Sequence, residues 1–320
     1  MQKIKKQIIQ NKYLKVSTLN IGASLFEVIF KSKKINLILN LDNIENYKYK
    51  HQYIGSTCGR YSNRISNGFF FIRGKKYNLT KNDKKNTLHG GKEGFDKKIW
   101  KLIHKSKDKI IYNLISKDLD QGFPGNLNVK IEYKLKNNKL ISTYTYFSDK
   151  YTHVSLTNHS YWNLNQNKNL KIFNHDIKIN SNHYLPVNKK DIPLGNKKSV
   201  NNTFFDLRKF NNIGRKTLNG KKGIDVNYVV NSYKSSDVVT LINKKTKIKL
   251  KLKTNQPGLQ FYTGHKLSSF KNPINFSPFQ GLCLESQYFP NSPNEKNFPS
   301  TLVIPNKKYV MKTYYTFEDL

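Results

Sequence analysis

The amino-acid sequence predicts an all-β protein, a large sandwich or barrel of mainly antiparallel strands. Apolar and polar residues alternate with a period of two in several segments, which is typical of strands with one buried face. Turn residues recur at short intervals between these segments. No long segment carries an apolar stripe at the helical period of about 3.6 residues. We therefore expect packed sheets, rather than helices, to form the core.

The alternation also places the individual strands along the chain. The clearest is residues 247–253, where lysines alternate with Ile248, Leu250 and Leu252. We expect these lysines to form a solvated outer face rather than a site, because charged side chains protect a strand against unwanted pairing. The other predicted extended segments are 69–72 and 76–79 (a hairpin around Arg73-Gly74-Lys75), 129–135 and 140–147 (a second hairpin), 172–179, 238–242 (paired with 247–253) and 300–304.

Length and composition indicate a globular domain. The chain has 320 residues, of which 37% are hydrophobic, and all-β domains are often long, so we expect residues 1–320 to form a single domain. The cysteines Cys58 and Cys283 lie far apart and lack metal-ligand spacing. No segment has the apolar length of a signal peptide or a membrane span. We therefore expect a cytoplasmic protein in a reducing compartment, with no membrane partner.

The formal net charge of +37 points at first to nucleic-acid binding. However, only five of the 57 basic residues are Arg, and the lysines are spread over the whole chain. Proteins that read nucleic acids usually employ Arg for paired contacts to bases and phosphates. We interpret the charge as a substitution bias towards Lys, Asn and Ile, such as an AT-rich genome would produce. We expect no specific nucleic-acid partner, although weak association with polyanions at very low salt is compatible with such a field.

Uncharged segments stand out in a chain that is 24% charged. Such segments are either buried or used for function. They are 151–167, 254–265 and 272–284. Glycine is also unevenly distributed, since seven of the 17 glycines lie within residues 55–94, together with Arg60 and Arg64. A guanidinium offers paired donors that suit vicinal hydroxyls, but ordinary ion pairs are the alternative for both arginines.

Four further residues are candidates for a site. His89 precedes two glycines, which would leave room for a ligand, although a structural histidine fits equally. His159 lies among polar and aromatic residues without any charge, as sugar-binding segments often do. Glu285 ends an apolar run, where partial burial would raise its pKa towards that of a general base, unless it forms a buried salt bridge. Asp225 is compatible with a simple turn.

Six ordered segments of the chain resemble the aldose 1-epimerase family, along nearly the whole length from about residue 15 onwards. We find no phosphate-binding glycine loop, dinucleotide fingerprint, zinc-protease motif or nucleophile elbow that would favour another chemistry. The segments that carry the resemblance are Gly59-Arg60-Tyr61-Ser62-Asn63-Arg64-Ile65, Asn86-Thr87-Leu88-His89-Gly90-Gly91 with Gly94-Phe95-Asp96-Lys97, Asp120-Gln121-Gly122-Phe123-Pro124-Gly125-Asn126-Leu127, Leu156-Thr157-Asn158-His159-Ser160-Tyr161-Trp162-Asn163-Leu164, Pro257-Gly258-Leu259-Gln260-Phe261-Tyr262-Thr263-Gly264, and Leu284-Glu285-Ser286-Gln287 with Phe289-Pro290-Asn291-Ser292-Pro293-Asn294.

The resemblance implies a large, mainly antiparallel β-sandwich of the galactose mutarotase type, with no cofactor and no metal. It places Glu285 on the catalytic base and His159 on the catalytic acid. It places the substrate-binding positions on Arg64, His89, Asp225 and Gln260, with Asn63 as a further candidate beside Arg64. Two positions depart from the usual family pattern: Val226 stands where His is common, and His265 stands where Asn is common. We expect either departure to affect sugar preference or loop packing.

The implied activity is interconversion of the α and β anomers of free hexoses such as D-galactose and D-glucose. Two alternatives stay open at this point: an epimerase of hexose 6-phosphates with the same fold, and a non-catalytic sugar-binding protein. The intact pair of Glu285 and His159 argues against the second. Trp162 is expected either to form a stacking wall for the sugar or to pack in the core. Both a monomer and a homodimer are compatible with the sequence.

Overall fold

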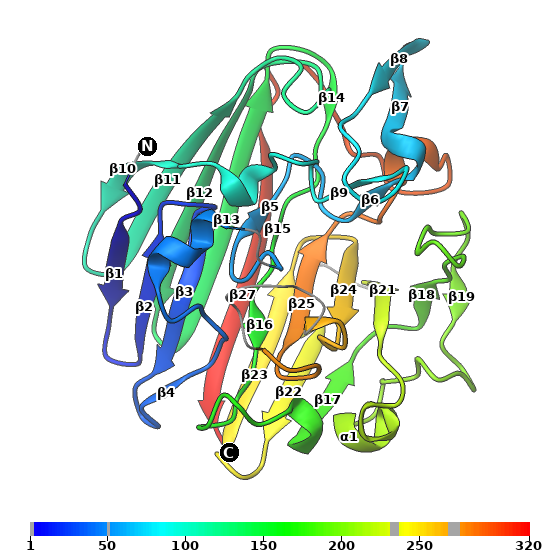
Figure 1. The fold of residues 1–320 in the computed structure, drawn as a ribbon. Helices are drawn as coiled ribbons and strands as arrows, with labels where there is room; N and C mark the ends of the chain where they lie inside the picture. The colour runs from blue at the N-terminus through cyan, green and yellow to red at the C-terminus, as the bar shows by residue number, and fades with distance from the viewer. Residues whose placement is uncertain (1–2, 50–51, 231–236, 268–275) are drawn as a thin grey trace.

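A computed structural model describes residues 3–49, 52–230, 237–267 and 276–320 of the protein. It consists mostly of strands, and all pairings between the strands named below are antiparallel, as the sequence predicts. The strands form two layers (Figure 1). A long sheet makes the back layer in this view, and two smaller sheets lie in front of it and cover its inner face.

The back layer is a nine-stranded sheet. It contains two of the predicted hairpins, residues 129–147 and 238–253, and the second of these includes the strand with alternating lysines. Its strands, in spatial order, are β10 (Lys101–Lys105), β11 (Lys109–Ser116), β12 (Leu127–Lys136), β13 (Lys139–Ser148), β27 (Tyr309–Asp319), β23 (Ile248–Thr254), β22 (Val239–Asn243), β17 (His175–Ile179) and β20 (Asn211–Asn212). The turn between β12 and β13 is tight because Asn137 adopts a left-handed φ of 53°, a conformation that Asn tolerates.

The front layer contains a four-stranded and a six-stranded sheet. The first is formed, in order, by β1 (Lys6–Gln10), β2 (Leu14–Leu19), β3 (Ser24–Phe30) and β4 (Ile35–Asn36). The second is formed, in order, by β16 (Tyr161–Trp162), β25 (Leu282–Gln287), β24 (Gly258–Tyr262), β21 (Asp225–Val229), β18 (His183–Leu185) and β19 (Lys198–Ser199). The candidate site lies on this six-stranded sheet.

Short strand pairs and single helical turns connect the layers. The pairs are β5 (Thr57–Cys58) with β15 (Thr157–Asn158), β6 (Arg64–Ile65) with β9 (Thr87–Leu88), β7 (Phe69–Ile72) with β8 (Lys75–Asn78), and β14 (Thr152–His153) with β26 (Leu302–Val303). Within the described residues, the α-helix is α1 (Ile213–Lys216), and the 3-10 helices are η1 (Ile44–Lys48), η2 (Ser66–Gly68), η3 (Phe95–Lys97), η4 (Ile172–Asn174), η5 (Leu218–Gly220) and η7 (Ser292–Asn294).

The main hydrophobic core fills the space between the layers. It joins apolar residues of the nine-stranded sheet, such as Ile131 and Leu250, to residues of the front sheets, such as Val28, Phe261 and Leu284. Each of these strands contributes alternate residues to the core. In β12 and β23 the period of two read from the sequence is also the period of burial. The hydrophobic effect of this shared core holds the two layers together.

Two sequence expectations need correction. Residues 172–179 were expected to be extended throughout, but 172–174 form η4 and the strand begins only at His175. This follows from the buried Ile172, which packs into the core from a single helical turn. Residues 300–304 contribute only the two-residue strand β26. Part of the uncharged segment 272–284, residues 272–275, lies outside the described residues.

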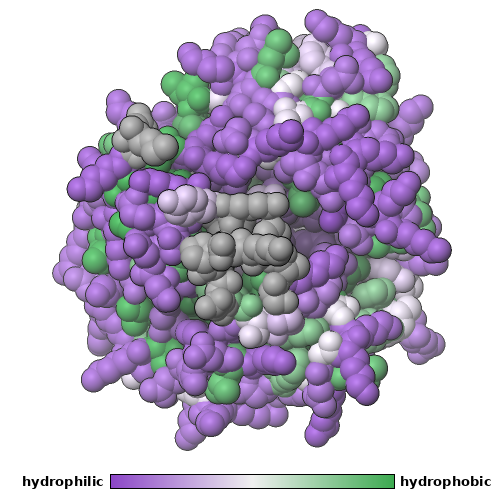
Figure 2. Space-filling model, in the orientation of Figure 1, coloured by the Kyte–Doolittle hydropathy of each residue, from purple (hydrophilic) through white to green (hydrophobic). Residues whose placement is uncertain are grey.

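Hydrophilic residues cover most of the face seen in Figure 2, and a hollow opens near its centre. The lysines of β23 lie on the outer face of their strand, where Lys249 and Lys251 each pair with Glu318 of the neighbouring β27. They are therefore surface lysines, as expected. None of the helices in the described part of the chain has the length and apolar character needed to span a bilayer.

Candidate functional site

The candidate site is built on one face of the six-stranded sheet. Along β25 the side chains alternate: Leu282 and Leu284 enter the core between the layers, so Cys283 and Glu285 point to the opposite face. Antiparallel register then puts Gln260 of β24 directly opposite Glu285. In the same way Asp225 of β21 lies opposite Tyr262 of β24, which lies opposite Cys283. Strand pairing alone thus gathers Glu285, Gln260 and Asp225 on one surface.

A buried imidazole lies against the Glu285 carboxylate. His159 follows β15, and its Nε2 lies 3.7 Å from Oε1 of Glu285. Both side chains are almost inaccessible, with 6% and 3% of their surface exposed. On the other edge of the ring, Nδ1 of His159 lies 3.5 Å from Sγ of Cys283. The structure therefore brings together the two residues that the sequence proposes as acid and base.

Glu285 has the electrostatics of a base. Burial, and secondarily the negative charge of Asp225, raise its pKa well above the ordinary value of 4.5. Its Oε2 atom is buried and has no hydrogen-bond partner among the described residues. A carboxylate held in this way binds a proton more tightly than one in water, and it has an oxygen available for a ligand.

A second histidine faces the first. His89 follows β9, and its ring centroid lies 5.3 Å from that of His159. Burial, followed by the charges of His159 and Arg64, lowers the pKa of His89 well below 6.5, which favours the neutral ring. Its Nδ1 accepts a hydrogen bond from the backbone N–H of Asn63 at 3.1 Å. Nε2 therefore carries the ring proton, and His89 offers a hydrogen-bond donor.

The glycine after His89 has a different role from the one expected. Gly90 adopts a φ of +91°, and a Cβ on it would lie 1.8 Å from the carbonyl oxygen of Gly59. The missing side chain therefore allows two backbone segments to pack together rather than making room for a ligand. Asn63 also supports this loop, since its Oδ1 accepts a hydrogen bond from the N–H of Arg64 at 2.8 Å.

Asp225 and Gln260 form a hydrogen-bonded pair next to Glu285. Nε2 of Gln260 donates to Oδ1 of Asp225 at 2.6 Å, which leaves Oε1 of Gln260 buried without a partner among the described residues. Burial raises the pKa of Asp225, an effect opposed by this hydrogen bond and by the charge of Arg64. The pair thus presents a carboxylate oxygen and an amide oxygen as acceptors.

Arg64 brings in two carboxylates that sequence reasoning missed. Its Nε lies 2.7 Å from Oδ2 of Asp83, and its terminal nitrogen NH2 lies 3.3 Å from Oδ2 of Asp191. The second carboxylate also faces Lys266, whose Nζ is 3.8 Å away. A signal was present in the composition, because the chain has only 20 acidic residues against 57 basic ones and each acidic residue is therefore notable.

The alternative of ordinary ion pairs holds for Arg64, which contacts Asp83 and Asp191, whereas Arg60 forms hydrogen bonds to uncharged groups among the described residues. Its guanidinium is buried and donates to Oγ of Ser116 and to the carbonyl oxygens of Ser116, Lys117, Phe123 and Pro124. Burial lowers its pKa to about 10, against the opposing charges of nearby aspartates led by Asp120. Arg60 thus fixes a loop below the site, while Arg64 faces the site itself.

Aromatic rings surround the histidines, but Trp162 is not among them. The Trp162 ring packs in the core, 5.0 Å from the Tyr315 ring between centroids, because it lies on the same face of its strand pair as Leu282. The stacking wall proposed for it is therefore wrong. Tyr161, one residue earlier, points the other way, and its ring lies 5.1 Å from His159. The centroid of the Tyr53 ring lies 4.5 Å from that of His89 and 5.6 Å from that of His159.

The two departures from the family pattern fall in different places. Val226 is buried in the main core, on the face of β21 opposite to Asp225. This departure therefore concerns packing. His265 is half-buried and lies against Tyr262, with ring centroids 5.1 Å apart, within range of the Asp225 charge. The second departure is thus close to the site.

His89, His159 and Glu285 are also the kind of side chains that bind metals, and one ligand atom of each lies within 4.8 Å of the others. The fit is poor, because the hydrogen bond from Asn63 to Nδ1 of His89 keeps the proton on Nε2. A protonated nitrogen has no lone pair for a metal. The group suits hydrogen bonding better than coordination.

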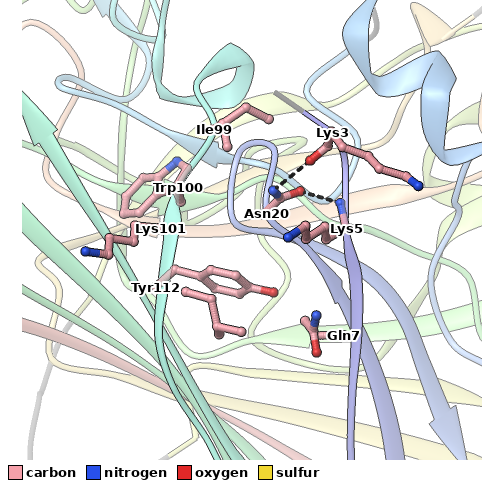
Figure 3. A pocket seen from close by; sticks show the side chains of 9 residues that line it. Lys3, Lys5, Gln7, Asn20, Ile99, Trp100, Lys101 and Tyr112 are labelled. Carbon is pink, nitrogen blue, oxygen red and sulfur yellow. Dashed lines mark hydrogen bonds between the residues drawn. The ribbon is translucent and has the colours of Figure 1, made fainter. Parts of the chain in front are cut away.

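A separate surface cavity of about 720 Å³ lies between the N-terminal strand and the β10–β11 edge of the back sheet (Figure 3). Asn20 links the first strand there, accepting from the N–H of Lys5 at 2.7 Å and donating to the carbonyl of Lys3. None of the described residues that line it is a carboxylate or an imidazole. It therefore lacks the acid–base groups of the site on the six-stranded sheet.

A carboxylate and an imidazole that lie 3.7 Å apart on an antiparallel β-sandwich suit an enzyme that transfers protons. The family model described as aldose 1-epimerase matches residues 5–316. The chain belongs to the aldose 1-epimerase family.

Similar proteins agree with this assignment over most of the chain. The chain is 33% identical to galactose mutarotase from Bos taurus over 98% of its own length and 94% of that protein. It is 34% identical to aldose 1-epimerase from Escherichia coli K12, covering 88% and 84% of the two chains. A crystal structure of a GalM/aldose epimerase homologue from C. elegans superposes with a TM-score of 0.92 at 26% identity, over 99% of this chain and 100% of that one.

Proposed function

We propose that this protein is an aldose 1-epimerase that interconverts the α and β anomers of free hexoses such as D-galactose and D-glucose. The observation that carries the proposal is the 3.7 Å approach of His159 Nε2 to Glu285 Oε1 in a buried site surrounded by hydrogen-bonding groups. Full-length similarity to galactose mutarotases and aldose 1-epimerases supports the same activity, which is that of an isomerase.

The reaction opens and recloses a hemiacetal, and it needs one base and one acid. The Glu285 carboxylate takes the proton from the C1 hydroxyl as the bond between C1 and the ring oxygen breaks. His159, as imidazolium, delivers its Nε2 proton to the ring oxygen. The aldehyde then rotates by half a turn about C1–C2, and closure returns both protons. Each positioned proton-transfer group typically contributes about 10²–10⁴-fold to such a reaction.

The short distance between the two groups suits this chemistry. In a hemiacetal the hydroxyl oxygen and the ring oxygen are attached to the same carbon. A carboxylate and an imidazole that lie side by side can therefore reach both oxygens at once. The raised pKa of Glu285, caused by burial and Asp225, strengthens it as a base.

The remaining polar groups hold the sugar while its ring is open. We assign Arg64 and the Nε2–H of His89 as donors to sugar hydroxyls, and Asp225 and Gln260 as acceptors. Asn63 shapes the loop that orients His89 and Arg64. This grip keeps the open aldehyde bound until it recloses.

We propose further that residues 1–320 act as one domain and that the enzyme works in the cytoplasm. Support for a reducing compartment comes from Cys58 and Cys283, which are both free and buried.

The decisive test is polarimetry on freshly dissolved α-D-galactose. With enzyme, the optical rotation should reach its equilibrium value much faster than in buffer alone, and the end point should be the same. An unchanged relaxation rate at micromolar enzyme would refute the proposal. α-D-glucose, tested in the same way, compares the two expected substrates.

A further inference from the structure

Asp191 stands out among the residues near the site because it lies on an exposed turn and yet contacts Arg64, a half-buried residue of the site. It belongs to the segment between β18 and β19, two strands that lie on the right of Figure 1. Asp191 Oδ2 lies 3.3 Å from NH2 of Arg64, whose side chain is only 15% exposed. The same oxygen lies 3.8 Å from Nζ of Lys266. The carboxylate therefore lies between two cations at the edge of the site.

The turn that carries Asp191 is well fixed. Oδ1 of Asn188 accepts from the N–H groups of Lys190 and Ile192, at 2.8 and 3.3 Å. The backbone also closes on itself, with Asp191 N–H donating to the carbonyl of Asn188 at 3.0 Å. Asp191 has a φ of 57°, a left-handed conformation that Asp and Asn tolerate better than most residues. The position of its charge is thus set by the backbone.

The charge of Asp191 reaches into the site. Its field, a smaller effect than burial, contributes to raising the pKa of Asp225. Arg64 is already paired with Asp83 at 2.7 Å. Asp191 adds a second carboxylate to the same guanidinium, and Asp225 and Glu285 add two more acidic groups nearby. Four carboxylates, those of Asp83, Asp191, Asp225 and Glu285, thus lie near the cations Arg64 and Lys266, in a chain whose formal net charge is +37.

We propose that Asp191 is a specificity-determining residue that makes the site reject anionic sugars, such as hexose 6-phosphates, and accept neutral ones. A neutral hydroxyl can accept a hydrogen bond from Arg64 while the guanidinium keeps both carboxylates. A phosphate or carboxylate on the sugar would instead have to compete with Asp191 for the same charge and would be repelled by it. The inference rests on the proposed function and specifies which sugars it serves.

The test compares wild type with Asp191→Asn in polarimetric assays on α-D-glucose and α-D-glucose 6-phosphate. Asn tolerates the left-handed backbone and keeps the side-chain shape, so this variant removes the charge alone. The ratio of kcat/KM for the phosphate to kcat/KM for the free sugar should rise on the order of tenfold at low salt. The rise should shrink at about 0.5 M NaCl, because the charge is partly exposed and therefore screened.

Asp319→Asn is the matched control. Asp319 pairs with Lys33 at the far end of β27, so this change alters net charge equally without touching the site. Its substrate ratio should equal that of wild type. The inference is overturned if Asp191→Asn folds and keeps the wild-type ratio, or if wild type uses the phosphate as well as the free sugar. A wild type without activity on either sugar would instead refute the proposed function itself.

Discussion

Strands β23 and β25 both send alternate apolar residues into the core, but the opposite faces of the two strands have different surroundings. In β23 the apolar residues enter the core and the lysines between them face solvent, where Lys249 and Lys251 pair with Glu318. In β25 the leucines enter the core in the same way, but the outward residues Cys283, Glu285 and Gln287 are buried as well. Burying polar groups costs free energy unless they are bonded or used. A polar strand face that is nevertheless buried therefore indicates function, whereas a charged face in solvent indicates solubility.

We expect the largest effect on kcat from removing the carboxylate charge of Glu285 on β25. Glu285→Gln keeps the shape of the side chain but cannot accept the C1 proton. We expect kcat for galactose to fall by about 10²–10⁴-fold, while calorimetry still detects sugar binding. A variant with wild-type kcat would remove Glu285 from the mechanism.

The second effect concerns the imidazole that faces Glu285. His159→Asn should lower kcat by roughly 10²-fold or more, because the ring oxygen loses its proton donor. His153 provides a matched control, since it is also buried but binds Thr301 through Nδ1 at 2.9 Å, away from the six-stranded sheet. His153→Asn should leave kcat unchanged. Equal losses in both variants would mean that His159 only supports packing.

Substitutions of Arg64 and Arg60, which belong to one motif, should affect different properties: sugar binding for Arg64 and protein stability for Arg60. Arg64→Ala should raise KM for galactose on the order of tenfold, because a charge-assisted donor to the sugar is lost. Arg60→Ala should instead lower Tm, because Arg60 holds the backbone carbonyls of Ser116, Lys117, Phe123 and Pro124 together. An Arg64 variant with unchanged KM would contradict its place in the sugar site.

The buried carboxylate of Glu285 should also lower the free energy of unfolding when it is charged. Because burial and Asp225 raise the pKa of Glu285, the folded state binds its proton more tightly than the unfolded state does. The stability that this group contributes is therefore greatest at low pH and is lost as pH rises through the raised pKa. At pH 8, Glu285→Gln should melt above wild type, by roughly 2–4 °C if the charge costs about 1 kcal/mol.

This stability difference should shrink as the pH falls towards 4.5, the ordinary pKa of Glu, because Glu285 is then protonated in both the folded and the unfolded state. Differential scanning calorimetry at both pH values checks the sign. A variant that melts below wild type at pH 8 would show that Glu285 is satisfied in the folded state.

The smallest effect is expected on the solvated strand. Lys251→Gln removes one surface ion pair with Glu318, and such pairs are worth about 0–1 kcal/mol. Urea unfolding should show a change within that range, and kcat should not change. A large loss of either would mean that the lysine face of β23 is more than a solvated surface.

Local patterns predicted the fold better than the site. The alternation in β23 and in the β12–β13 hairpin is a property of neighbouring residues, so the sequence alone reveals it. The approach of His159 to Glu285 depends on how β15, β16 and β25 assemble, and only the family motifs pointed to it before the structure did. Arg60 and Arg64 look alike in local sequence. The family motif pointed to Arg64 alone, and the packing shows that Arg60 binds backbone carbonyls instead. Apart from the scarcity of acidic residues, nothing in the sequence marks Asp83, Asp191 and Tyr53, because contacts across the fold bring them to the site.

The pH dependence of kcat for α-D-galactose, in wild type and in the Glu285→Gln and His159→Asn variants, tests the acid–base pair most directly. The wild-type profile should be bell-shaped, falling at low pH as Glu285 is protonated and at high pH as His159 loses its proton. Each variant should keep only the limb of the residue that it retains. A bell of the same shape in all three proteins would show that other groups transfer the protons.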